Sequence, residues 1–140
     1  MRVIFKRRSF VLKAKLPLIA RLLMGLIFTV FGLIGLFNLI PAPPDLPERM
    51  QTFMNGMAAS GYFMQLVKGT EVICGLLLLS GFFVPLALVV LAPITLNIFL
   101  VHAFMAPDGL VIALVIGLLH LYLAFFAPPY APTIKQLFRR

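Results

Sequence analysis

The longest runs without a charged residue set the first limit on what this chain can fold into. No Lys, Arg, Asp or Glu occurs in residues 22–44, 72–107 or 109–134. Charged residues make up 11% of the chain, whereas about a quarter is usual for a soluble domain. A soluble globular fold is therefore excluded, and the charge-free runs indicate membrane-spanning helices.

The middle run is too long for a single crossing. Its 36 residues would form a helix of roughly 54 Å at about 1.5 Å per residue, against a hydrocarbon core of roughly 30 Å. Gly81 and Pro85 mark the break. The sequence thus predicts an all-α fold, an integral membrane antiparallel bundle of four transmembrane helices. The expected spans are about 17–40, 62–79, 84–105 and 110–126, with Pro17 in the first turn of the first span.

Basic residues gather at the two ends of the chain. Seven of the twelve Lys and Arg residues lie in residues 1–21, and three more lie in residues 135–140. Short basic flanks stay on the cytoplasmic side of a membrane. We therefore expect basic cytoplasmic tails at 1–16 and 128–140 around a membrane domain at 17–127. Because the cations form no continuous basic face, the expected partner is the lipid bilayer and not nucleic acid.

The loop after the first span has the pattern of an amphipathic helix. Asp45 is placed to N-cap a short helix, and Glu48 is placed to complete a capping box. The apolar residues that share one helical face are Met50, Phe53, Met54 and Met57. We expect this helix to lie on the outer membrane surface.

Small residues predict where the spans touch, because close packing drives helix association inside a bilayer. Two sets have helical spacing: Gly25, Thr29 and Gly32 on the first span, and Ala113, Gly117 and Ala124 on the fourth. We expect both sets to face neighbouring helices.

Two charged side chains lie within the second span. Lys68 and Glu71 are three residues apart, so they are neighbours on one helix. A charge near the bilayer centre costs roughly 2.5–3.5 kcal/mol on insertion scales, so Glu71 should face the bundle interior and pair with Lys68. The pair is either part of a proton-exchange or ligand site, or a structural ion pair that fixes how the helices pack.

Further polar residues lie mainly in the outer half of the predicted bundle. Asn97 and His102 lie on the third span. Together with Lys68 and Glu71 they predict an outward-facing polar pocket, with Glu71 as its floor. The alternatives are an interhelical hydrogen bond for Asn97 and an interfacial position without a special role for His102.

Asn38, near the outer end of the first span, and His120, near mid-depth in the fourth, are secondary polar residues for which packing is the simpler interpretation. No metal site and no covalently bound cofactor is expected, since one Cys and two separated His residues form no ligand cluster. The familiar motifs of soluble enzymes are not present, so the sequence identifies no catalytic residue.

Three stretches carry a family resemblance: residues 21–28 (RLLMGLIF), 66–81 (LVKGTEVICGLLLLSG) and 93–102 (PITLNIFLVH). They resemble the first three helices of the DoxX-like family of small four-helix bacterial membrane proteins, over roughly residues 18–128. The resemblance implies an inner-membrane protein. For some relatives it also implies a link to thiosulfate:quinone oxidoreductase, as a small membrane subunit. By the same resemblance, Glu71, Asn97 and His102 form the candidate site.

These observations predict an accessory or quinone-interacting subunit of a membrane redox system. A quinone or a lipid, a soluble redox partner, or a second copy of the chain are the partners expected besides the bilayer. The first alternative is a non-catalytic membrane scaffold or assembly factor, in which the polar residues only fix packing. The second is a small-solute or proton-coupled transporter, which is disfavoured because no inverted repeat of broken helices is evident.

Overall fold

The chain folds into helices joined by loops. In the computed structural model, the backbone is described for residues 2–140 and the side chains for residues 12–140. The elements are α1 (Arg2–Phe37), α2 (Glu48–Ala59), α3 (Phe63–Ser80), α4 (Val84–Phe104), the 3₁₀ turn η1 (Pro107–Gly109), α5 (Leu110–Leu121), the π-helical turn η2 (Tyr122–Phe126) and α6 (Ala131–Gln136). No strand occurs in residues 2–140, and the predicted all-α fold is confirmed.

Four helical segments are long and apolar enough to cross a bilayer. They are Leu12–Phe37, Phe63–Ser80, Val84–Phe104 and Pro107–Phe126. Their outward faces carry large apolar side chains, of which Ile73, Val111 and Leu118 are each more than half exposed. A continuous apolar surface of this kind requires lipid around it, so the chain is a multi-pass membrane protein.

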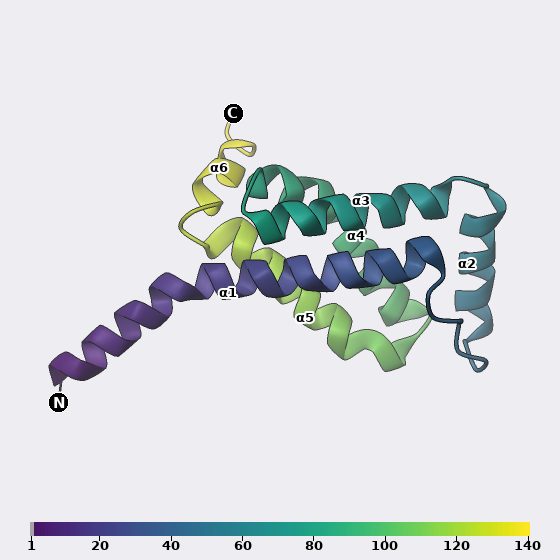
Figure 1. Ribbon diagram of the computed structural model, residues 1–140, viewed down its shortest axis with the longest axis horizontal. Helices are drawn as coiled ribbons and strands as arrows, with labels where there is room; N and C mark the ends of the chain where they lie inside the picture. The colour runs from purple at the N-terminus through teal and green to yellow at the C-terminus, as the bar shows by residue number, and fades with distance from the viewer. Residues whose placement is uncertain (1) are drawn as a thin grey trace.

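The spans form a bundle in which both chain ends lie at the same end, as Figure 1 shows. At the opposite end, α2 lies across the ends of α1 and α3 (Figure 1). α1 packs mainly on α3, whereas α4 packs on α3 and α5. α1 and α4 are therefore on opposite sides of the bundle. The core between them contains Met24, Phe28, Leu78, Leu91 and Leu123, all buried.

α1 begins before the span that the sequence predicts. It starts at Arg2 and continues through Pro17, so the prediction that Pro17 lies in the first turn is wrong. Proline removes one helical hydrogen bond and bends a helix, but the helix can continue beyond it. Figure 1 shows the first part of α1 projecting from the bundle at an angle to the rest, which is the effect expected of such a bend.

Asn38 ends α1. Its φ is 50°, in the left-handed region that Asn tolerates better than most residues. The Leu39 N–H donates to the carbonyl oxygen of Ile34 at 3.0 Å, which is the bond of a Schellman C-cap. The Asn38 side chain is exposed. Its role is thus to terminate the helix three residues before the predicted end.

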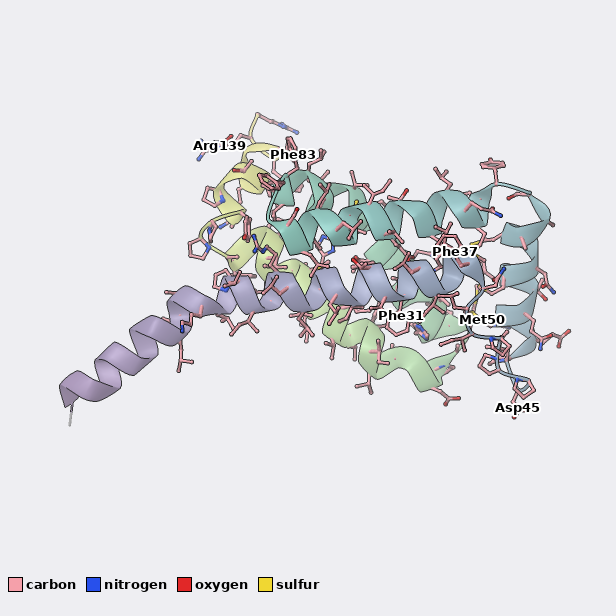
Figure 2. All side chains as sticks on the ribbon, viewed as in Figure 1. Phe31, Phe37, Asp45, Met50, Phe83 and Arg139 are labelled. Atoms are coloured by element: carbon pink, nitrogen blue, oxygen red, sulfur yellow. The ribbon has the colours of Figure 1, made fainter. Side chains whose placement is uncertain are left out.

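α2 is the amphipathic helix expected in the first loop. Its half-buried residues are Met50, Phe53, Met54 and Met57, and its other residues are exposed. Met50 lies on the side of α2 toward the bundle (Figure 2). The predicted cap is wrong, because Pro47 is the N-cap and no side chain caps the helix. Asp45 lies two residues too early to reach the first N–H groups of a helix that begins at Glu48.

Glycines bring α1 and α3 into close contact. A Cβ on Gly25 would lie 3.0 Å from the carbonyl oxygen of Gly75, and a Cβ on Gly75 would lie 2.7 Å from the backbone nitrogen of Thr29. A Cβ on Gly32 would lie 2.8 Å from Cγ2 of Val72. These distances are shorter than side chains normally allow, so the contact predicted for the first span is confirmed.

The corresponding prediction for the fourth span holds only in part. Ala113 and Ala124 are buried, but a Cβ on Gly117 would meet open space. Gly117 lines an apolar groove of about 480 Å³ between α4, α5 and α6. Gly117 therefore borders open space and is not a contact residue.

The glycine contact predicts opposite effects of the same substitution at two sites on α3. Gly75→Ala should lower the free energy of unfolding by about 1–3 kcal/mol, because the added methyl group overfills the contact with α1. Gly69→Ala should be neutral or slightly stabilising, because a Cβ there meets no atom within 4 Å and Ala favours a helix over Gly. Thermal unfolding in detergent checks both, and equal effects would contradict the close contact.

Candidate functional site

Lys68 and Glu71 form an ion pair on the first half of α3. The Lys68 Nζ donates to both carboxylate oxygens of Glu71, at 3.1 Å to Oε1 and 2.9 Å to Oε2. Three residues of helix separate the two positions, which places them on the same face, one turn apart. The pairing expected from the spacing is present.

The two partners differ in how deeply they are buried. The Glu71 side chain is 3% exposed and that of Lys68 is 23% exposed. A buried carboxylate without a partner is strongly unfavourable, and the adjacent ammonium offsets that cost. The carboxylate is therefore the enclosed member of the pair.

Glycines of α1 make room for this pair. A Cβ on Gly35 would lie 2.7 Å from Cδ and 2.8 Å from Cε of Lys68. A Cβ on Gly32 would lie 3.2 Å from the Cβ of Glu71. Because Gly35 has no side chain, the Lys68 stem can lie flat against α1 with its ammonium directed at Glu71.

A cavity of about 260 Å³ opens beside the ion pair. Its polar boundary is formed by Lys68, Glu71 and His102. The remaining wall is apolar apart from the glycine and comes from α1, α4, η1 and α5: Ile27, Phe28, Phe31, Ile98, Gly109, Ile112 and Ile116. Figure 2 shows Phe31 between α1 and α5. The site therefore combines one polar end with a hydrophobic, partly aromatic enclosure.

His102 is held in a defined orientation at the end of α4. Its Nδ1 lies 3.0 Å from the backbone oxygen of Ala106. A carbonyl oxygen only accepts, so Nδ1 carries the hydrogen and the neutral ring presents Nε2 as an acceptor. A Cβ on Gly109 would collide with this ring. Gly109 thus lets the imidazole lie against the loop between α4 and α5.

The cavity can bind a ligand with a polar end and an apolar body. An ammonium has three N–H donors, and Glu71 takes two of those of Lys68. One donor remains for a ligand acceptor. His102 adds an acceptor through Nε2. Among residues 12–140, no three side chains of His, Cys, Asp or Glu come together as a metal site requires.

Asn97 does not belong to this site. Its side chain is exposed, and it does not line the cavity. The residues of α4 that turn inward nearby are Leu91, Ile98 and His102, at spacings of seven and four. Asn97 lies about 100° around the helix from Ile98. The prediction that it joins Glu71 and His102 in one pocket is wrong for this reason.

The two secondary polar residues also lie elsewhere. Asn38 ends α1 with its side chain exposed. His120 is buried, and its Nδ1 lies 2.8 Å from Oγ1 of Thr95. This bond ties α5 to α4 at the base of the apolar groove. This bond agrees with the packing interpretation of His120, and the sequence reasoning did not identify its partner Thr95.

Sequence reasoning also missed Phe28, Phe31, Gly35 and Gly109. The aromatic pair lies on the same helical face as Gly32 and Gly35, and that spacing could have placed it beside the second span. No comparable pattern identifies Gly109, because its contact with His102 depends on how the chain turns between α4 and α5.

The ion pair predicts non-additive effects on stability. Lys68→Met should lower the free energy of unfolding by about 3 kcal/mol, because it leaves a buried carboxylate without a partner. Glu71→Leu should cost less, because the partly exposed Lys68 can turn its ammonium toward the surface. The double variant should recover most of the loss. Unfolding in detergent measures this cycle, and strictly additive losses would show that the two residues are not coupled.

The matched region of the chain contains the polar end of the cavity. Residues 16–103 match the DoxX family, from the membrane part of α1 to the last turn of α4, whereas the expected resemblance extended to residue 128. Lys68, Glu71 and His102 lie within the match, and the α5 wall lies beyond it. No curated protein and no solved structure matches the chain. Since the match covers more than half of its residues, the chain belongs to the DoxX family.

Proposed function

We propose that this DoxX-family protein is an accessory membrane subunit that binds the head group of a quinone for a membrane redox system. The observation that carries the proposal is the polar end of the cavity, where Lys68, Glu71 and His102 meet a wall of aromatic and aliphatic side chains. A quinone has the matching chemistry, with carbonyl oxygens on an apolar ring.

The size of the cavity favours a head group over a whole lipid. About 260 Å³ is close to the lower end of the range for small-molecule pockets, about 300–1,000 Å³. A single substituted ring fits within such a space, with Phe28 and Phe31 positioned to contact its face or edge. Ile112 lines the cavity and is 54% exposed. It marks the side on which a lipid tail would leave toward the bilayer.

Each polar residue has a distinct part in this proposal. The remaining N–H of Lys68 donates to a carbonyl oxygen of the head group. Glu71 holds the Lys68 ammonium in place beside the cavity through two hydrogen bonds. His102 presents Nε2 as an acceptor, which bonds a hydroxyl group of the reduced quinone, the quinol.

The proposed orientation follows from the basic ends of the chain. Both ends lie at one end of the bundle (Figure 1), and ten of the twelve Lys and Arg residues belong to residues 1–21 and 135–140. By the positive-inside rule this end is cytoplasmic. The cavity lies toward the α2 end, so it belongs to the outer half of a bacterial inner membrane.

A second candidate is a non-catalytic scaffold or assembly factor. The Lys68–Glu71 pair is complete within α3. An ion pair of this kind can have a purely structural role, in which it fixes how the helices pack. In that case the cavity binds no head group. The following experiment distinguishes the two functions.

A quinone should stabilise the protein against heat, because a ligand that binds only the folded state raises its stability. The probe is a short-chain benzoquinone, added to the protein in detergent. We expect about a tenfold weaker affinity for Lys68→Met, since one hydrogen bond to a charged donor is lost. Ile112→Trp should abolish the thermal shift by filling the cavity.

Val111→Trp is the matched control, because Val111 is 72% exposed and does not line the cavity. It should keep the full thermal shift. If Ile112→Trp and Lys68→Met also keep the full shift, the quinone does not bind in this cavity. If the unaltered protein shows no shift, the scaffold is favoured.

A further inference from the structure

Asn97 is a polar residue on the side of α4 that points away from the bundle. It lies three residues beyond Ile94, the midpoint of α4, which is about 4.5 Å at roughly 1.5 Å per residue. The side-chain hydrogen bonds of α4 join Thr95 to His120 and His102 to Ala106, and Asn97 takes part in neither. Its exposed carboxamide therefore faces the hydrocarbon layer. Lipid offers it no hydrogen-bond partner there.

Asn97 also belongs to a regular row of exposed residues. The row consists of Leu86, Val90, Pro93, Asn97, Leu100 and Phe104, all exposed. Their spacing alternates between four and three residues. This is the a/d repeat by which two helices pack along a seam, and a single Asn at an a position is a known device for fixing register and partner number. We call this row the α4 seam.

The side of α4 opposite the seam is already occupied. Val84, Leu88, Leu91 and Thr95 are buried on the opposite side, where α4 packs on α3 and α5. The six residues of the α4 seam are exposed, so no described part of this chain covers them. A partner helix would thus meet a face that is apolar except for one carboxamide.

We propose that the α4 seam pairs with the same seam of a second copy of this chain. A carboxamide is both a donor and an acceptor, so two Asn97 side chains can satisfy each other. Two copies inserted with the same topology place Asn97 at the same depth. A two-fold axis along the membrane normal then sets the α4 helices parallel, with an isologous interface.

Disulfide cross-linking in native membranes tests the seam directly. Cys74 is the single Cys and is buried, so Cys74→Ala provides the background. Leu100→Cys lies on the α4 seam, one turn from Asn97. Val30→Cys is the control, because Val30 is similarly exposed, at 43% against 40%, but lies on α1 across the bundle. We expect an oxidant to yield a homodimer with Leu100→Cys and little with Val30→Cys.

The role of Asn97 is tested in the Leu100→Cys background. Asn97→Leu should weaken dimerisation about tenfold, measured as the shift in cross-linked fraction when the protein is diluted in lipid vesicles. Asn97→Gln retains the carboxamide and should keep most of the dimer. Thermal unfolding checks that Asn97→Leu still folds, as expected for an apolar residue facing lipid.

Three results would overturn the proposal. Equal cross-linking at Leu100→Cys and Val30→Cys would indicate random collision. An unchanged dimer in Asn97→Leu would show that the carboxamide does not hold the interface. A cross-linked product of Leu100→Cys with the mass of another protein would assign the seam to a different partner.

Discussion

An ion pair inside an apolar bundle is the constraint on which the rest of this structure depends. Glu71 can remain charged among hydrocarbon-facing helices only while Lys68 stays within hydrogen-bond distance and lipid is kept away. Close packing of α1 on α3 meets both conditions, because the glycines of α1 bring the two backbones together and leave room for the Lys68 stem. The same arrangement directs the remaining Lys68 donor into the cavity, where His102 and the walls of α1 and α5 complete the site.

The sequence predicts those parts of this arrangement that follow from the free-energy cost of placing a charge in lipid. Charge-free runs indicate the spans, because charged residues are expensive in lipid. Lys68 and Glu71 are the two charged residues of the predicted second span, three residues apart, which marks them as a pair. The same reading assigns Asn97 and His102 to the third span, but a position along a helix does not determine which way its side chain turns. Rotation of α4 is set by its packing on α3 and α5, and it brings His102 inward and Asn97 outward.

Other features of the structure were not predicted, because they depend on the absence of a side chain or on the path of a loop. Gly35 and Gly109 matter because a Cβ there would displace Lys68 or His102, and neither effect can be read from composition or spacing. Asn38 illustrates the converse: a residue interpreted from the sequence as a secondary polar or packing residue ends α1 through its left-handed backbone. Pro17 bends α1 without ending it, because the helix resumes its hydrogen bonds after the one that proline removes.

The ionised state of Glu71 is the most direct test of the ion pair. Infrared difference spectra between the unaltered protein and Glu71→Gln, in lipid at neutral pH, separate a carboxylate from a protonated carboxyl group. The ion pair predicts loss of a carboxylate signal in Glu71→Gln, and the appearance of a protonated carboxyl signal once Lys68→Met removes the partner. A protonated carboxyl signal from Glu71 in the unaltered protein would contradict the account.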